Sequence, residues 1–227
     1  MRGLFITGTN TEVGKTYVAA LIAQQLAAEN RRVGVYKPVA SGCSVHDGKL
    51  VADDAVALWH AAGEPGELAR VCPQCFAAPL APHLAASAEN KSVDGKLLRT
   101  GFRYWQDNSD VVLVEGAGGL MSPLSDDDYN ADLAAEFGLP LVVVAPNVLG
   151  TINATLQTLI TASTFRDGLA VAGIVLNSNT DGRDDPSTKS NRQELEMRCV
   201  SPVLAAVDYN GGFDRVVDWW ALVEGDV

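Results

Sequence analysis

The chain has 227 residues, 47% of them hydrophobic, which is enough for one sizeable domain with a substantial core. Its 17 Lys and Arg and 28 Asp and Glu residues give a formal net charge of -11, which argues against a nucleic-acid-binding protein because such proteins usually carry a basic face. No apolar run approaches the ~18 residues of a membrane span, and residues 4–6 are too few for a signal-peptide core, so we expect a cytoplasmic protein.

Short apolar runs alternate with helical patterns along the chain. The predicted elements, in chain order, are a strand over 3–7, a helical stripe over 18–26, a strand over 33–36, helices over 53–62 and 97–106, a strand over 111–114, a helix over 131–137, a strand over 141–144, a helix over 151–165, a strand over 171–176, a helix over 191–199 and a strand over 203–207. This alternation predicts a single α/β domain, residues 1–227, with a parallel sheet and helices on both faces. Ligands of such sheets bind beyond the carboxyl ends of the strands, and we expect each motif described below to follow a strand directly, so that the motifs converge on one edge.

Three segments lack a clear pattern. Pro65, Pro73, Pro79 and Pro82 interrupt the chain between the helices predicted over 53–62 and 97–106. Residues 181–190 are polar enough for a mobile loop. For the acidic run 126–128, a solvated loop is the simplest interpretation.

The segment after the first predicted strand, Gly8-Thr-Asn-Thr-Glu-Val-Gly-Lys-Thr16, has the form of a phosphate-binding loop. Backbone N–H groups from Val13 to Thr16 would point at phosphate oxygens, and Gly14 would allow a close approach. Lys15 would reach the β- and γ-phosphates, and the Thr16 hydroxyl would bind Mg²⁺. The sequence therefore predicts a binding site for a nucleoside triphosphate and a divalent cation.

This loop departs from the strict motif at its first glycine. The strict spacing requires glycine at position 9, where this chain has Thr9, and the glycine here is Gly8. The alternative is an ordinary helix start with Thr11 as N-cap and Lys15 in solvent. We favour nucleotide binding because Gly-Lys-Thr follows a strand and precedes a helix.

Taken whole, residues 7–16 resemble the loop of the dethiobiotin synthetase family, whose extra residue accounts for the shifted glycine. Residues 36–42 (Tyr-Lys-Pro-Val-Ala-Ser-Gly) resemble its substrate-binding lysine segment, and residues 54–58 its metal-associated aspartate helix. Residues 114–119 (Val-Glu-Gly-Ala-Gly-Gly) match its glycine-rich acidic loop. Pro82-His83, 149–153 and 175–177 also fall where the family carries related residues. The resemblance runs from residue 4 to about residue 177, and the order and spacing of the segments make it specific.

This resemblance implies a P-loop fold and an enzyme that converts 7,8-diaminononanoate, CO₂ and ATP to dethiobiotin, ADP and phosphate, with Mg²⁺. One amine would capture CO₂ as a carbamate, whose oxygen would attack the γ-phosphorus to give a carbamic-phosphoric anhydride. The second amine would then close the ring. Lys15 and Lys37 are the expected catalytic residues, since they can hold the carbamate beside the γ-phosphate.

The resemblance also assigns the remaining site residues. The nucleotide and its metal would be bound by Glu12, Val13, Gly14, Lys15, Thr16, Tyr17, Asp54, Glu115, Gly116, Ala117, Gly118, Asn177 and Ser178, with Thr16, Asp54 and Glu115 on the metal. The second substrate would be bound by Thr11, Lys37, Ser41, Gly118, Gly150, Thr151 and Asn153.

Several of these residues have simpler alternative roles. Lys37 could be a solvated lysine at a strand end, and Ser41 could cap a turn. Asp54 could be the N-cap of its helix, with Asp53 as the rival metal ligand. Glu115 follows four buried apolar residues, where a carboxylate is costly unless it is paired or bound to metal.

The glycines and the helix predicted over 151–165 leave further alternatives. Gly118 and Gly119 could turn the chain, present N–H groups to the carbamate, or do both. Helix N-termini bind anions, so Gly150, Thr151 and Asn153 could bind the substrate carboxylate, although Asn153 could simply cap or pack. In the family this helix belongs to the neighbouring subunit, which implies a homodimer with the site at its interface.

Adenine contacts would come from Asn177 and from the segment after the last strand. That segment is Asp208-Tyr-Asn210 here and lacks the proline often found in the family.

Other readings of the chain are less well supported. Corrin-ring amide ligases usually carry a glutaminase domain, for which there is no room. Partition-type ATPases commonly have a second lysine early in the loop, where this chain has Asn10. A nucleotide-binding module without activity would not need Lys37 and Glu115. Cys72 and Cys75 have the spacing of half a zinc site, but no second pair follows, which favours two reduced thiols.

Overall fold

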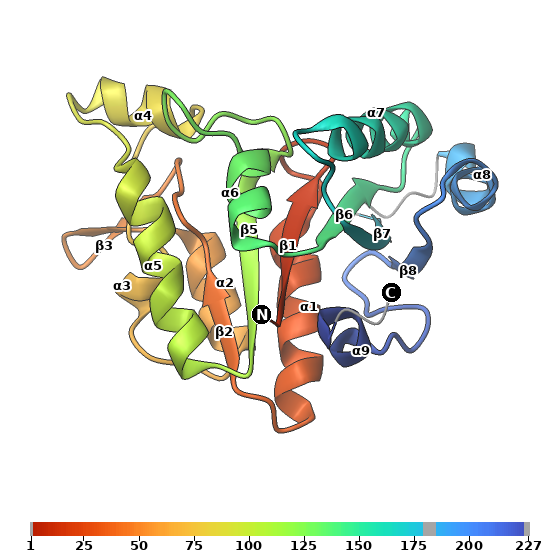
Figure 1. Ribbon diagram of the computed structural model, residues 1–227, viewed down its shortest axis with the longest axis horizontal. Coiled ribbons are helices and arrows are strands. Elements are labelled where there is room, and N and C mark those ends of the chain that lie inside the picture. Colours follow the sequence, from red (N-terminus) through yellow and green to blue (C-terminus); the bar gives the residue numbers. More distant parts are fainter. Residues whose placement is uncertain (1, 179–184, 225–227) are drawn as a thin grey trace.

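Six parallel strands form the main sheet in the order β2-β5-β1-β6-β7-β8 in a computed structural model that describes residues 2–178 and 185–224 (Figure 1). The strands are β1 (Gly3–Gly8), β2 (Val33–Tyr36), β5 (Val111–Gly119), β6 (Leu141–Pro146), β7 (Val171–Asn177) and β8 (Val203–Val207). They are apolar on both sides, and β1 is buried along its whole length. Such continuous burial is expected when helices cover both faces of a parallel sheet.

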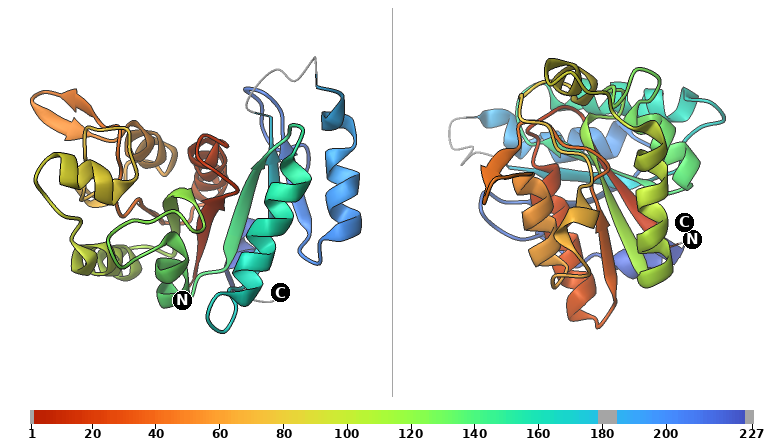
Figure 2. Two further views of the ribbon diagram at one scale, coloured as in Figure 1. Left: turned by 90° about the horizontal axis from the view of Figure 1, so that it is seen from above. Right: turned by 90° about the vertical axis from the view of Figure 1, so that its left-hand side faces the viewer.

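Helices do cover both faces of this sheet (Figures 1 and 2). On one face lie α1 (Lys15–Ala28) and α2 (Asp53–Ala61), which contact each other. On the other lie α5 (Gly95–Asn108), α6 (Asn130–Phe137) and α7 (Thr151–Thr164). Two further helices pack near the β8 edge and the chain start, α8 (Asn191–Arg198) against α7 and β8, and α9 (Trp219–Glu224) against α1 and β1. The predicted α/β architecture is confirmed.

Besides the predicted helix α2, the chain between β2 and α5 contains structure that was not predicted. A hairpin of β3 (Ser44–His46) and β4 (Lys49–Val51) precedes α2, and two short helices follow it, α3 (Leu68–Val71) and α4 (Pro82–Ala88). Pro82 occupies the first turn of α4, where its missing N–H leaves no helical hydrogen bond unmade. Pro82 therefore begins a short helix in a region that the prolines were expected only to interrupt.

Several element boundaries also differ from prediction. Asp94 caps α5 by accepting hydrogen bonds from the N–H groups of Lys96 and Leu97, so this helix begins at Gly95 rather than at residue 97. Strand β5 continues past Val114 to Gly119, because Gly119 still pairs with Gly8 of β1. Glycines that read as a turn in the sequence thus extend a buried strand.

The polar segment 181–190 was predicted to be a mobile loop, and its residues 181–184 lie outside the described residues. Its second part forms the 3₁₀ turn η1 (Pro186–Lys189). Asp185 accepts hydrogen bonds from the N–H groups of Ser187 and Leu149, each at 2.9 Å. Residues 185–190 thus include a hydrogen-bonded turn rather than irregular structure alone.

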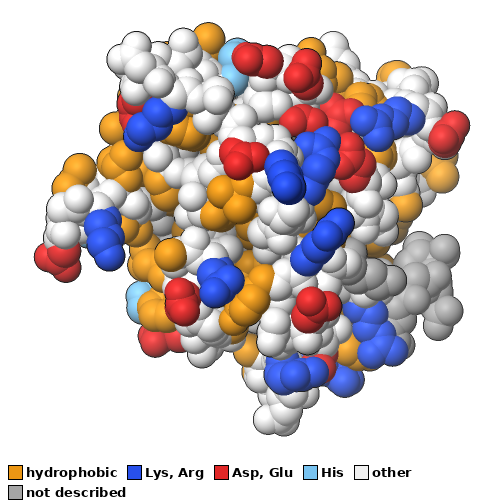
Figure 3. Space-filling view, turned by 60° about the vertical axis from the view of Figure 1, so that its left-hand side comes forward, with side chains coloured by type: hydrophobic (Ala, Val, Ile, Leu, Met, Phe, Trp, Pro, Cys, Tyr) orange, Lys and Arg blue, Asp and Glu red, His pale blue; other side chains and the backbone are white. Residues whose placement is uncertain are grey.

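Charged side chains of both signs lie beside one another on the face seen in Figure 3. The acidic run 126–128 is not simply a solvated loop, because Asp128 is buried and its carboxylate accepts a hydrogen bond from Arg99 at 2.7 Å. Sequence alone gave no sign of this pairing, since Arg99 lies on another element. None of the described helices is long and apolar enough to span a membrane.

Candidate active site

The phosphate loop connects the carboxyl end of β1 to α1. Gly14 is the N-cap of α1 with a φ of 89°, and a Cβ on it would lie 2.0 Å from Nδ2 of Asn177. A Cβ on Gly8 would lie 2.8 Å from the carbonyl oxygen of Asn10, so the early glycine lets the loop fold back onto the strand end. Thr11 is not the N-cap, and that alternative is wrong.

Lys15 is buried at the start of α1. Its Nζ donates a hydrogen bond to the carbonyl oxygen of Asn10 at 3.1 Å. Burial lowers the pKa of Lys15 below its ordinary value, although Glu115 partly offsets the effect. A solvated Lys15 is therefore excluded, and the buried ammonium is suited to an anionic ligand.

Lys37 lies beside Glu115 because the strands that carry them are neighbours in register. Tyr36 pairs with Val114, so the next residue of each chain segment, Lys37 and Glu115, lie side by side. Nζ of Lys37 is 2.6 Å from Oε1 of Glu115 and 2.6 Å from Oδ2 of Asp54. Burial acts to lower the pKa of Lys37, but the two carboxylates outweigh it and raise the pKa above its ordinary value. Lys37 is thus a buried cation and not a solvated lysine.

The three predicted metal ligands meet around this lysine. The Thr16 hydroxyl donates to Oε1 of Glu115 at 2.8 Å. Burial acts to raise the pKa of Asp54, but Lys37 outweighs it and lowers the pKa. Asp54 is not the N-cap of α2, a position held by Ala52. Its rival Asp53 has a side chain that is 76% exposed and lies 3.6 Å from His46, away from this cluster.

Thr16, Asp54 and Glu115 fit a magnesium ion by their chemistry. Glu115 is 1% exposed, and its Oε2 is buried without a hydrogen-bond partner. Two carboxylates and a hydroxyl are the hard oxygen donors that Mg²⁺ prefers. Within residues 2–178 and 185–224, no group of three His, Cys, Asp or Glu side chains is placed to hold a metal ion. Further ligands would come from phosphate oxygens and water, as is usual for Mg²⁺.

A cavity of ≈ 770 Å³ opens over the phosphate loop and the lysine cluster. Twelve of the predicted site residues line it: Thr11, Glu12, Gly14, Lys15, Thr16, Tyr17, Lys37, Ser41, Asp54, Glu115, Ala117 and Gly118. Residues that were not named as site residues complete the wall: Ala40, Pro79, Leu80, Ala81, Pro82, Ser122 and Pro123. The volume is in the range of small-molecule sites.

Four predicted nucleotide-site residues do not line this cavity: Val13, Gly116, Asn177 and Ser178. Asn177 is buried, and its Nδ2 donates to the carbonyl oxygen of Val13 at 3.0 Å, so this amide braces the phosphate loop. The N–H of Ser178 donates to the carbonyl oxygen of Val207. The contact of Asn177 with adenine stays a prediction.

The start of α7 lies away from the cavity of its own chain. Gly150 and Asn153 are exposed, whereas Thr151 is buried. The N–H of Thr151 already donates to the carbonyl oxygen of Val148 at 3.2 Å. Of the three residues predicted to bind the substrate carboxylate, Gly150 and Asn153 are therefore the accessible ones.

Other contacts at this edge could not be read from motifs. The Gly119 N–H donates to Oγ of Ser122 at 2.8 Å and is therefore already bonded within the chain. Of the two glycines predicted to donate N–H groups to a carbamate, Gly118 is the one that stays a candidate. The Tyr17 hydroxyl donates to the carbonyl oxygen of Gly211 at 2.7 Å and ties the segment after β8 to α1. Asn130, which no motif singled out, bonds the glycine-rich end of β5.

Cys43, Cys72 and Cys75 lie near the segment that carries Ser41. All four cysteines are free thiols, and the Sγ atoms of Cys72 and Cys75 are 3.6 Å apart. The carbonyl oxygen of Phe76 accepts from the N–H of Cys43 at 3.0 Å, so the segment around Cys75 supports the one around Ser41.

Comparison with known proteins agrees with this geometry. Residues 2–216 match the AAA domain family. The ATP-dependent dethiobiotin synthetase BioD of Rhodopirellula baltica is 43% identical over 92% of this chain and 84% of its own length. The enzyme of the same name from Anaeromyxobacter dehalogenans is 45% identical over 95% of this chain and 93% of its own length.

A solved structure shares the fold alone. The ParA family ATPase of Chlorobium tepidum superposes with a TM-score of 0.54 over 91% of this chain and 83% of that chain, at 15% identity. At this identity the likeness supports the α/β fold and carries no function to this chain. Because the sequence relatives match nearly the whole chain and the phosphate loop, Lys37, Asp54 and Glu115 converge on one cavity, the chain belongs to the ATP-dependent dethiobiotin synthetase family.

Proposed function

We propose that this protein catalyses the ATP- and Mg²⁺-dependent closure of 7,8-diaminononanoate with CO₂ to dethiobiotin, a step of biotin biosynthesis. The observation that carries the proposal is the buried Lys37 held 2.6 Å from both Asp54 and Glu115 beside the phosphate loop. A plain nucleotide hydrolase needs no second buried lysine at this place. The names of the relatives support the same reaction.

The proposed reaction has three steps: carbamate formation, phosphoryl transfer and ring closure. One amine of the substrate adds to CO₂ and loses a proton, which gives a carbamate. A carbamate oxygen attacks the γ-phosphorus of ATP, the bond from that phosphorus to the bridging oxygen breaks, and ADP leaves. The second amine attacks the carbonyl carbon of the mixed anhydride, the bond from that carbon to the phosphate oxygen breaks, and phosphate leaves with the release of a second proton.

The chain's own residues mainly hold and neutralise anions in these steps, as is usual in phosphoryl transfer. Lys15 binds the β- and γ-phosphates, and Lys37 lies between the γ-phosphate and the carbamate. The raised pKa of Lys37 keeps its ammonium charged at neutral pH. Thr16, Asp54 and Glu115 would hold Mg²⁺, which neutralises phosphate charge when bound. Ser41 and Gly118 face the same cavity and bind the carbamate end of the substrate.

A homodimer supplies the other end of the substrate site in this proposal. Gly150 and Asn153 are exposed and lie outside the cavity of their own chain, which suits binding of a carboxylate held by a second copy. Subunit mixing tests this arrangement. Lys37→Ala and Asn153→Ala homodimers should each be impaired, whereas their hybrid contains one intact site. A random mixture should regain about a quarter of wild-type activity, as expected for exchange between two-fold dimers. No recovery after verified subunit exchange contradicts a shared site.

The reaction itself is tested with purified protein, ATP, Mg²⁺, bicarbonate and 7,8-diaminononanoate. Dethiobiotin is measured by mass spectrometry and ADP by a coupled assay. We expect one ADP per dethiobiotin and little ATP turnover without the diamine. ATP turnover that ignores the diamine, with no cyclic urea formed, would rule the proposal out.

A further inference from the structure

Asn130, the first residue of α6, is 0% exposed and lies beneath the glycine-rich end of β5. Asn130 does not line the cavity, and none of its three side-chain hydrogen bonds goes to the phosphate loop. A buried side-chain amide is costly to bury unless its donors and acceptor are bonded. The partners of Asn130 therefore indicate what this residue is for.

All three hydrogen bonds of the Asn130 amide go to β5. Its Nδ2 donates to the carbonyl oxygens of Ala117 and Gly119, each at 2.7 Å. Its Oδ1 accepts from the N–H of Ala117 at 3.1 Å. A Cβ on Gly116 would lie 2.6 Å from this Oδ1, so the amide packs directly against the strand backbone.

These bonds fall where the pairing of β5 with β1 is irregular. The register is Ile6 with Glu115 and then Gly8 with Gly119, so β5 advances four residues while β1 advances two. The extra residues form a bulge, a feature that re-aims side chains beside active sites. Asn130 bonds both backbone groups of Ala117, in the middle of this bulge. Glu115 and Gly118, on either side of Ala117, both line the cavity.

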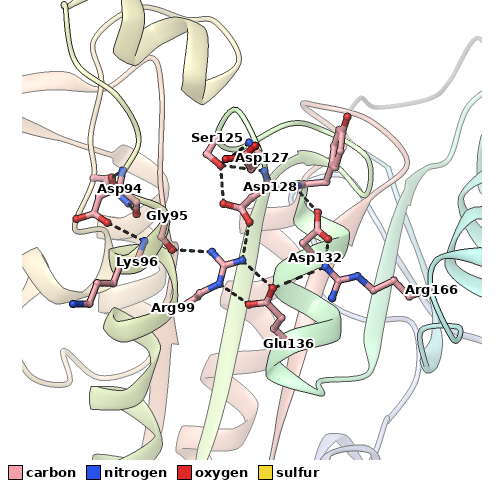
Figure 4. Close-up of polar contacts among 12 residues, drawn as sticks. Asp94, Gly95, Lys96, Arg99, Ser125, Asp127, Asp128, Asp132, Glu136 and Arg166 are labelled. Atoms are coloured by element: carbon pink, nitrogen blue, oxygen red, sulfur yellow. Dashed lines mark hydrogen bonds and ion pairs between the residues drawn. The ribbon is translucent and has the colours of Figure 1, made fainter.

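An ion-pair network fixes the segment that carries Asn130 (Figure 4). On one side, Asp128 accepts hydrogen bonds from Arg99 and from the Ser125 hydroxyl, each at 2.7 Å. On the other, Asp132 accepts from the N–H of Tyr129 at 2.9 Å and pairs with Arg166. Asn130 is therefore held from both sides of its own chain segment.

We propose that Asn130 is a positioning residue, whose amide holds the bulge at 116–119 so that Glu115 stays beside Lys37 and Gly118 faces the cavity. Asn130 touches no substrate and acts through this backbone. The kinetic consequence rests on the proposed function, whereas the hydrogen bonding of the bulge does not.

Two substitutions of Asn130 and one of its neighbour test this role. Asn130→Asp preserves the size of the side chain and an acceptor for the Ala117 N–H, but it cannot donate to the two carbonyl oxygens. Asn130→Ala removes all three bonds. Gly116→Ala disturbs the same contact from the strand side, because its Cβ collides with Oδ1, and it serves if the Asn130 variants fail to fold.

The matched control is Trp219→Phe. Trp219 is also buried, and its Nε1 donates to Oε1 of Gln25 at 2.7 Å, among α1 and α9 away from the cavity. The control loses a partly buried hydrogen bond and stability without touching the bulge.

Kinetics, unfolding in urea and exchange of the Ala117 amide by NMR are measured for each variant at a temperature where it is folded. We expect kcat to fall ~10- to 100-fold in the Asn130 and Gly116 variants, with KM for ATP changed less than ~3-fold, because misplaced groups cost rate more than phosphate binding. Trp219→Phe should keep kcat within ~2-fold at a similar loss of stability, since distant sites act independently.

Amide exchange separates this proposal from the proposed function. Exchange of the Ala117 N–H should be faster in Asn130→Ala and Gly116→Ala, which remove or displace its acceptor, than in the wild type and the control, whether or not dethiobiotin is formed. Unchanged exchange overturns the positioning role, and so does a kcat equal to that of Trp219→Phe. If the wild type makes no dethiobiotin, the proposed function fails while the exchange result still decides the role of Asn130.

Discussion

The charged cluster at the phosphate loop and the one around Arg99 differ in how fully their groups are paired. At the loop, Lys15 and Glu115 are buried, and Oε2 of Glu115 has no hydrogen-bond partner. Around Arg99, whose side chain is 34% exposed, the guanidinium donates to Asp128, to Glu136 and to the Gly95 carbonyl oxygen (Figure 4).

This difference separates a site for a ligand from a structural support. A buried charge with unmet bonding capacity is costly in the free protein and gains when a ligand completes its partners. A half-exposed and fully bonded network has little left to offer a ligand. The first cluster should therefore control activity and the second stability, and the following substitutions test that contrast.

The largest expected effect comes from Lys37→Ala. Dethiobiotin formation should fall at least ~10²- to 10³-fold, the scale seen when one group that stabilises developing charge is removed. The circular dichroism spectrum should stay close to wild type as the control. Near-normal turnover would refute the assigned role of Lys37.

Lys15→Ala should weaken ATP binding by ~10- to 100-fold, because it removes a charged hydrogen bond to the β- and γ-phosphates. ADP binding should be weakened less, since the γ-phosphate is absent. Isothermal titration calorimetry with both nucleotides measures the difference. Equal losses for ATP and ADP would place Lys15 elsewhere on the nucleotide.

Asp54→Asn and Asp53→Asn form a matched pair on adjacent residues. The first should raise the Mg²⁺ concentration needed for half-maximal activity roughly tenfold, because it removes one anionic ligand. Asp53→Asn should leave this Mg²⁺ concentration unchanged, because the Asp53 side chain is exposed beside His46. A magnesium titration at fixed ATP reports both, and the reverse order would show that Asp53 is the ligand.

Arg99→Ala should lower the free energy of unfolding by about 1–2 kcal/mol, allowing for its partial exposure. Its kcat should change much less than that of Asn130→Ala, because Arg99 is one step further from the cavity. Urea unfolding gives the stability, and Arg32→Ala, which breaks an exposed pair with Asp110, is the control with the smaller change. A large loss of kcat with unchanged stability would break the contrast between the two clusters.

The smallest effect is in the acid dependence of stability. The Arg99 guanidinium lowers the pKa of Asp128 below its ordinary value of 3.8. The ionised Asp128 carboxylate therefore contributes fully to the stability of the fold above pH 3.8. This contribution is lost as the pH falls through the lower pKa that Asp128 has in the folded protein. Asp128→Asn should flatten the decline of stability in acid when urea unfolding is followed against pH. An unchanged acid slope would show that Asp128 does not contribute to it.

Local patterns in the chain were enough to predict most of the sheet and the phosphate loop. The strand ends, Gly14, Lys15 and Thr16 follow from residues adjacent in sequence, so their relative placement needs no long-range information. The hairpin β3–β4 was missed because each of its strands has 3 residues, too few for an alternating pattern, and helices α3 and α4 were missed because prolines read only as interruptions. The extension of β5 was missed because glycines read as a turn.

The amino-acid sequence by itself determined the α/β class, the loop that would receive phosphate, and the resemblance that pointed to Lys37, Asp54 and Glu115. Only the tertiary structure decided how these residues meet, because the register of β2 on β5 sets Lys37 against Glu115 and the packing of α2 brings Asp54 to the same ammonium. The contacts of Asn130 were likewise decided only by the tertiary structure. Its partners lie 11 and 13 residues away on another element, and such contacts depend on chain packing that no local pattern records.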